Sequence, residues 1–219
     1  MIKRFTLYGS PHSLPTYKVA LMLRLAGEPF SFRYVSFQKG MHKTPEFLAL
    51  SRWGQVPVLV DGNFVLYESN AIVEYVDEAY PGRGAPLFPG DARTRAIARR
   101  FILEVDNYFN KAADELLDQA FWKKPEERDA QKIAEGRKAV TEELAMFSRS
   151  MHGEYLAGPL SAADFAFYPL VAFLYRAQKM KLPDLDADAM LTPELRAWKN
   201  RIETLPYFDK TIPPHWKAA

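Results

Sequence analysis

The stretch GQVPVLVDGNFVLYESNAI occupies residues 54–72 and contains two apolar runs separated by a turn signal. Residues 56–60 and 64–67 are rich in Val, Leu, Phe and Tyr, which favour β-strands. Asp61-Gly62-Asn63 between them is typical of a tight turn, so the two runs are predicted to form a β-hairpin. A helix over residues 69–79 is predicted to follow the hairpin.

The segments before this hairpin predict a mixed α/β unit. Residues 5–8 are predicted to form a strand, and residues 14–26 form a largely apolar helix that ends at Gly27. Residues 30–34 alternate aromatic with polar side chains, the period of a strand with one buried face. A short helix is predicted at Thr44-Pro45-Glu46, where Thr can cap and Pro suits the first turn. The order βαβ, short helix, ββα is that of a thioredoxin-like fold.

A change of composition divides the chain. Residues 81–90 are rich in Pro and Gly, which interrupt helices and strands, and we interpret them as a linker. The predicted domains are a thioredoxin-like domain over residues 1–80 and an all-helical domain over residues 91–219.

The second half is predicted to begin with two long helices, over about residues 91–122 and 126–151, both rich in Ala, Glu, Lys and Leu. Two more helices have clear start signals. Ser161-Ala162-Ala163-Asp164 is similar to a capping box and should begin a buried helix containing Pro169, and Thr192-Pro193-Glu194 repeats the pattern seen at Thr44.

Composition limits the possible functions. The chain has 29 Lys and Arg residues against 27 Asp and Glu residues, so it lacks the concentrated positive charge of most nucleic-acid-binding proteins. It contains no cysteine, which excludes disulfides, thiolate metal sites and a protein thiol nucleophile. The four histidines show no metal-ligand spacing, and we expect no metal. With neither an apolar signal region nor a membrane-spanning stretch, a cytoplasmic location is expected.

Four segments carry a resemblance to a known family. They are Gly9-Ser10-Pro11-His12-Ser13-Leu14-Pro15, Lys39 to Phe47, Gly54 to Leu59 and Tyr67 to Ile72. In this order, and followed by Ser161 to Phe165 in a helical second half, they resemble the glutathione transferases, most closely the serine-type theta, delta and phi classes. The resemblance implies a homodimeric enzyme without a permanent cofactor that uses glutathione as co-substrate.

The resemblance assigns residues to each charged end of glutathione. Glu68 would bind the α-ammonium of the γ-glutamyl group, and the Ser69 hydroxyl with the N–H groups of its helix would bind the adjacent carboxylate. His42 and Lys43 match the segment that binds the glycine carboxylate. Each also has a simpler interpretation, because Ser69 can be only a helix cap and the charged residues can be solvated surface groups.

The central part of glutathione is expected at Gln55 and Val56. Val56 would pair its backbone N–H and C=O with the cysteinyl residue, and Gln55 would donate to a nearby peptide group. The resemblance implies a cis Val56–Pro57 bond, although most bonds that precede proline are trans.

Ser13 is the expected activator of the glutathione thiol. Tyrosine-type classes carry their catalytic hydroxyl two residues before the loop proline, where this chain has Gly9, so Tyr8 is out of register. Cysteine-type chemistry is excluded by composition. The alignment favours Ser13 over Ser10, while a helix cap is the alternative role for Ser13.

The pocket for the second substrate is the least defined part of the prediction. In this family it lies between the first loop and the helical domain, so the candidate wall residues are Pro11, His12, Tyr108, Trp122 and Trp216. Tyr108 also belongs to a helical stripe of apolar residues that can face a core or a dimer interface. The predicted second substrate is a small hydrophobic electrophile. The alternative function is that of a non-catalytic binding or regulatory protein with the same fold.

Overall fold

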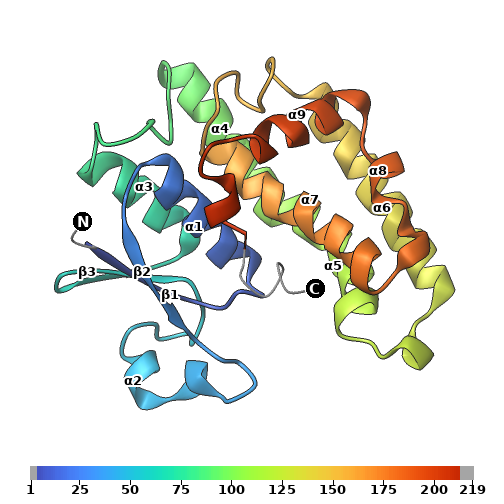
Figure 1. Ribbon diagram of the computed structural model, residues 1–219, viewed down its shortest axis with the longest axis horizontal. Coiled ribbons are helices and arrows are strands. Elements are labelled where there is room, and N and C mark those ends of the chain that lie inside the picture. Colours follow the sequence, from blue (N-terminus) through green and yellow to red (C-terminus); the bar gives the residue numbers. More distant parts are fainter. Residues whose placement is uncertain (1–3, 213–219) are drawn as a thin grey trace. The chain divides into compact units, whose positions relative to one another are not determined.

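The computed structural model describes residues 4–212 and contains two compact units (Figure 1). Among the described residues, the first unit comprises 4–89 and 206–212, and the second comprises 90–205. The sequence placed residues 206–212 in the helical domain, but their contacts group them with the first unit. Phe208 and Thr211 in this segment are buried.

The first unit contains a four-stranded sheet with the order β2-β1-β3-β4. Its strands are β1 (Phe5–Gly9), β2 (Phe30–Tyr34), β3 (Val58–Asp61) and β4 (Phe64–Tyr67). Strand β1 pairs parallel to β2 and antiparallel to β3, and β3 pairs antiparallel to β4. The predicted hairpin and the predicted order of elements along the chain, that of a thioredoxin-like fold, are confirmed.

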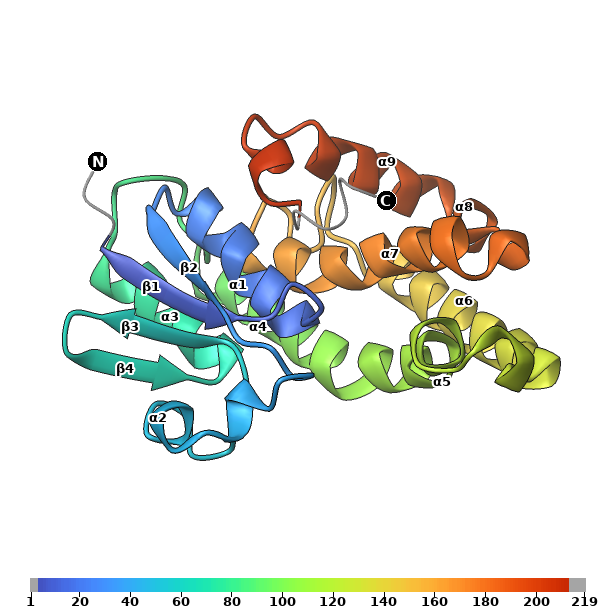
Figure 2. The same cartoon turned by 60° about the horizontal axis from the view of Figure 1, so that its bottom comes forward.

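Three helices cover this sheet: α1 (Leu14–Leu25), α2 (Pro45–Leu48) and α3 (Ser69–Ala79) (Figure 2). Helix α2 packs its Phe47 against one face, beside Val58 and the partly buried Tyr8. The opposite face carries Phe5 and Leu7, which are buried, on the side of the packed pair α1 and α3. Alternate side chains of the strands therefore supply two small cores.

Strand β3 begins two residues later than the sequence indicated. The prediction started it at Val56, whereas the structure starts it at Val58. Pro57 has no N–H to donate to a ladder, so strand pairing begins after it.

The second unit is built of helices α4 (Ala92–Glu104), α5 (Asn110–Phe121), α6 (Ala130–Arg149), α7 (Ala162–Met180), α8 (Ala187–Met190) and α9 (Pro193–Glu203). The predicted long helix over about 91–122 is continuous from Ala92 to Phe121, but a π-helical segment, Val105–Phe109, separates α4 from α5 within it. The second long helix begins at Ala130, after a 3-10 turn at Pro125–Glu127.

Helix α7 forms the core of the second unit, and 14 of its 19 residues are buried. The predicted capping box is present, and Asp164 in it also accepts bonds from other elements. One Asp164 oxygen accepts from the Leu156 N–H at 3.0 Å and the Trp198 indole N–H at 2.8 Å. The other accepts from the Ser161 N–H at 2.9 Å and the Ser161 hydroxyl at 3.3 Å. Burial raises the pKa of Asp164 to about 6, and these hydrogen bonds oppose the rise.

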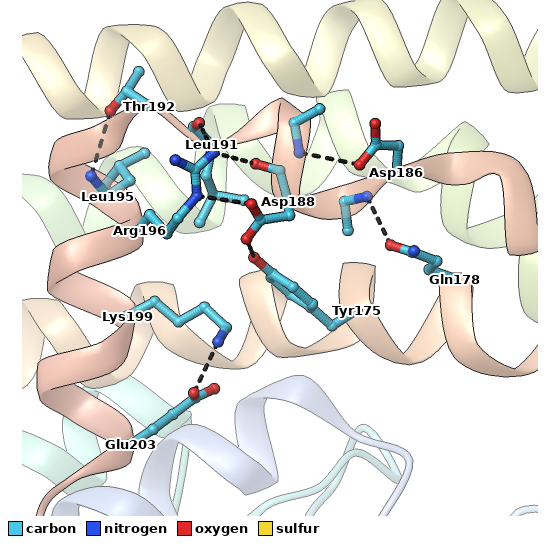
Figure 3. Close-up of polar contacts among 12 residues, drawn as sticks. Tyr175, Gln178, Asp186, Asp188, Leu191, Thr192, Leu195, Arg196, Lys199 and Glu203 are labelled. Atoms are coloured by element: carbon cyan, nitrogen blue, oxygen red, sulfur yellow. Dashed lines mark hydrogen bonds and ion pairs between the residues drawn. The ribbon is translucent and has the colours of Figure 1, made fainter.

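A polar network joins α7, α8 and α9 (Figure 3). The Tyr175 hydroxyl donates to Asp188 at 2.8 Å, and the Arg196 guanidinium pairs with the other oxygen of the same carboxylate at 2.8 Å. Lys199 bonds Glu203 at 2.8 Å and lies 4.6 Å from the centre of the Tyr175 ring. Each contact joins groups within this unit, so we assign the network a structural role. Within residues 4–212, the structure has no helix with the length and apolar character needed to cross a bilayer.

Replacing Asp164 by Asn should destabilise the second unit strongly. In Asn an NH2 group replaces one carboxylate oxygen, so two of the groups that donate to Asp164 would face a donor instead of an acceptor. We expect the free energy of unfolding to fall by about 3 kcal/mol and Tm to fall by roughly 5–10 °C. Thermal unfolding followed by circular dichroism measures this change. Asp184→Asn, at an exposed carboxylate on the loop after α7, is the control and should leave Tm unchanged. Equal Tm values for the two variants would contradict the assignment.

Candidate active site

A cleft of about 90 Å³ opens where the first unit brings three chain segments together. Its lining residues are Pro15, Ser51, Trp53, Gln55, Val56, Pro57, Tyr67, Glu68 and Ser69. Four of the predicted glutathione-binding residues are among them: Gln55, Val56, Glu68 and Ser69. They come from the loop before β3 and from the junction of β4 with α3.

Strand direction explains why two helix N-termini lie near this cleft. Strands β1 and β4 both pair antiparallel to β3, so they run in the same direction. Their carboxyl ends therefore lie at the same edge of the sheet, and the chain enters α1 after β1 and α3 after β4. Helix N-termini carry partial positive charge and unpaired N–H groups, which favour bound anions.

The N-terminus of α3 is built around an unusual backbone conformation. Glu68 precedes the helix with φ 72° and ψ 108°, a region that costs of order 1–3 kcal/mol for a non-glycine residue. No side chain caps this helix, and its first turn contains no acidic residue. Glu68 is exposed, and Ser69 lies at the first helical position. The first turn is therefore open to an external anion, beside a carboxylate suited to a cation.

The N-terminus of α1 distinguishes Ser13 from Ser10. Ser13 is the half-buried cap residue, and its hydroxyl oxygen accepts from the Thr16 N–H at 3.2 Å. The hydroxyl hydrogen is not used in that bond. Ser10 is buried, and its oxygen faces the His12 N–H at 3.4 Å. The cap role of Ser13 is thus present in the structure and is compatible with donation to a ligand.

Few other amides in the first turn of α1 are available. Pro15 has no N–H, and the Tyr17 N–H bonds the Ser13 carbonyl at 3.0 Å. The Leu14 N–H is consequently the one first-turn amide for which the described residues supply no acceptor. A thiolate at this helix end would meet the Ser13 hydroxyl and the field of the helix.

The loop between these helix ends has the expected cis Val56–Pro57 bond. No backbone bond within residues 4–212 uses the N–H or C=O of Val56, which leaves both for a strand-like partner. Gln55 is exposed at the cleft, and its backbone N–H donates to the buried Ser51 hydroxyl at 3.3 Å. This bond anchors the loop to a buried residue of the first unit.

His42 and Lys43 do not line the cleft, although they lie near its loop. Both belong to the 3-10 turn Met41–Lys43. The His42 ring packs edge-on against Phe37, and its buried Nδ1 has no hydrogen-bond partner among the described residues. The His42 carbonyl oxygen would lie 2.5 Å from a Cβ added at Gly54, so the turn and the loop approach each other closely.

The structure adds cleft residues that the sequence argument did not assign: Pro15, Ser51, Trp53 and Tyr67. Trp53 is the most prominent, with 62% of its surface exposed and the Arg52 guanidinium 5.0 Å from its ring centre. The sequence signal that could have indicated Trp53 as a cleft residue is its position directly before Gly54-Gln55. Exposure of a single aromatic residue cannot be deduced from sequence, because such residues are more often buried.

The predicted wall of the electrophile pocket is only partly placed. Pro11 and Ser10 line an apolar cavity of about 220 Å³ in the first unit, together with residues of α1, β2 and the segment 210–212. His12 is exposed. Tyr108 and Trp122 are exposed residues of the second unit, and Trp216 lies outside the described residues. The grouping of these residues into one pocket stays a prediction.

The fold and the cleft define a class of two-unit proteins: a thioredoxin-like unit with a cleft at the start of α3, joined to a helical unit. Comparison with known proteins identifies the family. Residues 7–84 match the family model described as glutathione S-transferase, N-terminal domain, and residues 113–206 match glutathione S-transferase, C-terminal domain. The chain is 32% identical to glutathione S-transferase 3 of Zea mays over 94% of this chain and 92% of that protein. The chain belongs to the glutathione S-transferase family.

Solved structures agree with this assignment. The crystal structure of glutathione transferase F2 from Populus trichocarpa has a TM-score of 0.83 at 26% identity, over 98% of this chain and all of that chain. The theta-class enzyme of Xanthomonas axonopodis pv. citri, solved with glutathione bound, has a TM-score of 0.78 at 27% identity, over 96% and 98% of the two chains.

Gly54→Ala should destabilise the loop of the cleft more than Gly40→Ala does. Both glycines have positive φ, 64° and 67°, so both variants incur the same backbone strain. An added Cβ at Gly40 meets no atom within 4 Å, whereas at Gly54 it meets the His42 carbonyl. We expect Gly54→Ala to lose about 2 kcal/mol more than Gly40→Ala in urea unfolding. Equal losses would show that this close approach is not needed.

Proposed function

We propose that the protein is a glutathione transferase that binds glutathione in this cleft, stabilises its thiolate with Ser13 and transfers it to small apolar electrophiles. The observation that supports this function best is the grouping of the α3 N-terminus, Glu68 and the Val56 backbone in one cleft beside the α1 N-terminus. These groups match the carboxylate, ammonium, peptide and thiol of one tripeptide.

The γ-glutamyl end would bind at the start of α3. Its carboxylate would accept from the Ser69 hydroxyl and the N–H groups of the first turn, and Glu68 would accept from its ammonium. The cysteinyl residue would pair with the N–H and C=O of Val56, while His42 and Lys43 would attract the glycine carboxylate from the neighbouring turn. This arrangement directs the thiol toward Ser13.

Ser13 would stabilise the thiolate by donating its hydroxyl hydrogen. Lowering a thiol pKa by two units requires about 2.7 kcal/mol of preference for the charged form. A hydrogen bond to a charged group contributes about 1.5–3 kcal/mol, and a helix N-terminus about 0.3–1 kcal/mol. Together these contributions are sufficient, so no general base is needed.

The chemical step is attack by the thiolate on an electrophilic carbon. A carbon–sulfur bond forms while the bond to the leaving group breaks and that group departs with the electron pair. With an activated alkene, the π bond breaks instead, its electron pair moves toward the activating group, and a proton from water completes the addition. Ser13 forms no covalent intermediate. The apolar cavity beside Pro11 supports an apolar second substrate, and by the family resemblance we propose Tyr108, Trp122 and Trp216 as further wall residues. We also propose a cytoplasmic homodimer.

Retention on immobilised glutathione followed by a conjugation assay with a chromogenic aryl halide tests the function. We expect both binding and turnover. Binding without turnover over a panel of electrophiles would support a non-catalytic role, and failure to bind would contradict the proposal.

Ser13→Ala should raise the pH at which the enzyme becomes active. Without the hydroxyl donor, the bound thiol should ionise about one to two units higher in the pH profile of kcat/KM, and activity near neutrality should fall at least tenfold. Ser10→Ala is the matched control and should keep the wild-type profile. The opposite pattern would transfer the role to Ser10.

Ser13→Cys gives an independent test, because the chain has no other cysteine. Its thiolate, favoured at a helix N-terminus, should attack oxidised glutathione, form a mixed disulfide and release one glutathione thiolate. Intact mass should increase by one glutathione. An unmodified protein would indicate that position 13 does not face the bound thiol.

Glu68→Gln should weaken glutathione binding rather than chemistry. Loss of the charge-assisted bond to the ammonium should raise KM for glutathione by roughly tenfold or more, with a smaller change in kcat. Glu46→Gln, at an exposed residue of α2, controls for net charge. Steady-state kinetics with varied glutathione distinguish them, and an unchanged KM in Glu68→Gln would remove Glu68 from the site.

A further inference from the structure

The apolar cavity beside Pro11 extends along helix α1. The α1 residues in its wall run from Thr16 to Arg24, a span of about 12 Å at about 1.5 Å per residue. Phe30 and Phe32 are the wall residues from β2, and all the described wall residues belong to the first unit. A wall of this length and character suits an extended apolar chain.

Two residues of this wall have buried polar atoms that lack a hydrogen-bond partner among the described residues. Thr16 is 2% exposed, and its Oγ1 is one of these atoms. The other is the Nε of Arg24, a half-buried residue in the last turn of α1. The Arg24 guanidinium lies over the Phe30 ring, 4.8 Å from its centre, and this contact restricts its orientation. An unpaired donor on a charged group costs free energy that a hydrogen-bond acceptor would recover.

The charge of the wall is positive. Arg24 and the exposed Lys210 are its charged residues, and none of the described residues in the wall is acidic. A carboxylate matches the guanidinium group, because the two can form parallel charge-assisted hydrogen bonds. A neutral apolar molecule would fill the cavity and leave the guanidinium without an acceptor. The wall therefore suits a molecule with an apolar body and one anionic end.

We infer that this cavity binds the second substrate and favours unbranched apolar electrophiles that end in a carboxylate, which Arg24 binds. This inference rests on the proposed function. Pro11 belongs to the loop that carries Ser13, so the electrophilic carbon would lie toward Pro11 and the carboxylate toward Arg24.

An α,β-unsaturated aldehyde with such a carboxylate is one substrate of this class. The glutathione thiolate would form a carbon–sulfur bond with the β-carbon while the carbon–carbon π bond breaks. The electron pair would move toward the carbonyl group to give an enolate, and a proton from water would complete the addition.

The test compares two substrates that differ at one end. One is trans-2-nonenal, and the other is the same aldehyde with a carboxylate in place of the terminal methyl group. The value of kcat/KM for each is measured at saturating glutathione, by loss of the enal absorbance, for wild type, Arg24→Met, Arg24→Lys and Arg33→Met. Arg33 is the matched control, because it is an exposed arginine of β2 that does not line the cavity.

Wild type should prefer the carboxylate substrate by about tenfold in kcat/KM, and Arg24→Met should lose this preference together with the charge-assisted bonds. Arg24→Lys should keep part of the preference, because lysine retains the charge but not the paired geometry. Arg33→Met should keep the wild-type preference. Nonanoate, which cannot react, should inhibit conjugation of the aryl halide in wild type and about tenfold more weakly in Arg24→Met.

A wild type that does not prefer the carboxylate substrate, or that nonanoate does not inhibit, would overturn the inference. The same preference in Arg24→Met as in wild type would also overturn it and leave Arg24 a structural role. If Arg24→Met does not fold, Arg24→Gln removes the charge and must show the same loss of preference. If wild type fails to bind immobilised glutathione, the proposed function fails rather than the assignment of Arg24.

Discussion

The direction of strand β3 is the constraint on which the site depends. Because β3 runs antiparallel to both β1 and β4, the two strands that flank it run in the same direction, and α1 and α3 begin at the same edge of the sheet. The cleft then combines two helix N-termini with the Val56 backbone, which has no partner in the described sheet. Helix N-termini favour bound anions, so this backbone geometry supports the proposed binding of the glutathione carboxylate and thiolate.

Local strain and close approach concentrate at this edge. Glu68 adopts positive φ between β4 and α3, and Gly54 allows the loop to lie against the turn that carries His42. Such features persist when the surrounding structure holds them, and here the sheet and the buried Ser51 do so. Glu68 and Gln55 are exposed at the cleft, and Ser69 at the start of α3 is half-buried.

Much of this fold could be predicted because its signals are local. The helix over 69–79, the cap at Thr44 and the capping box at Ser161 each depend on a few adjacent residues, and the structure contains all of them. The π-helical segment at Val105–Phe109 gave no such signal, because it depends on packing of the whole helix. The late start of β3 could have been predicted from the sequence, because Pro57 has no N–H to donate to a strand partner.

The site was predictable in part for the same reason. Gln55, Val56, Glu68 and Ser69 occur in two short motifs, so resemblance found them together. Trp53 lies outside the matched motifs, and its exposure at the cleft is a property of the folded chain. Exposure of this kind has no signature in a single sequence.

The central claim is that the two helix N-termini bind glutathione as a thiolate. Titrating the ultraviolet thiolate absorbance of glutathione bound to the wild-type protein tests it directly, with the free tripeptide as reference. We expect a midpoint about two pH units below that of the free thiol, which is about 8.5. A bound thiol that titrates like the free one would contradict it.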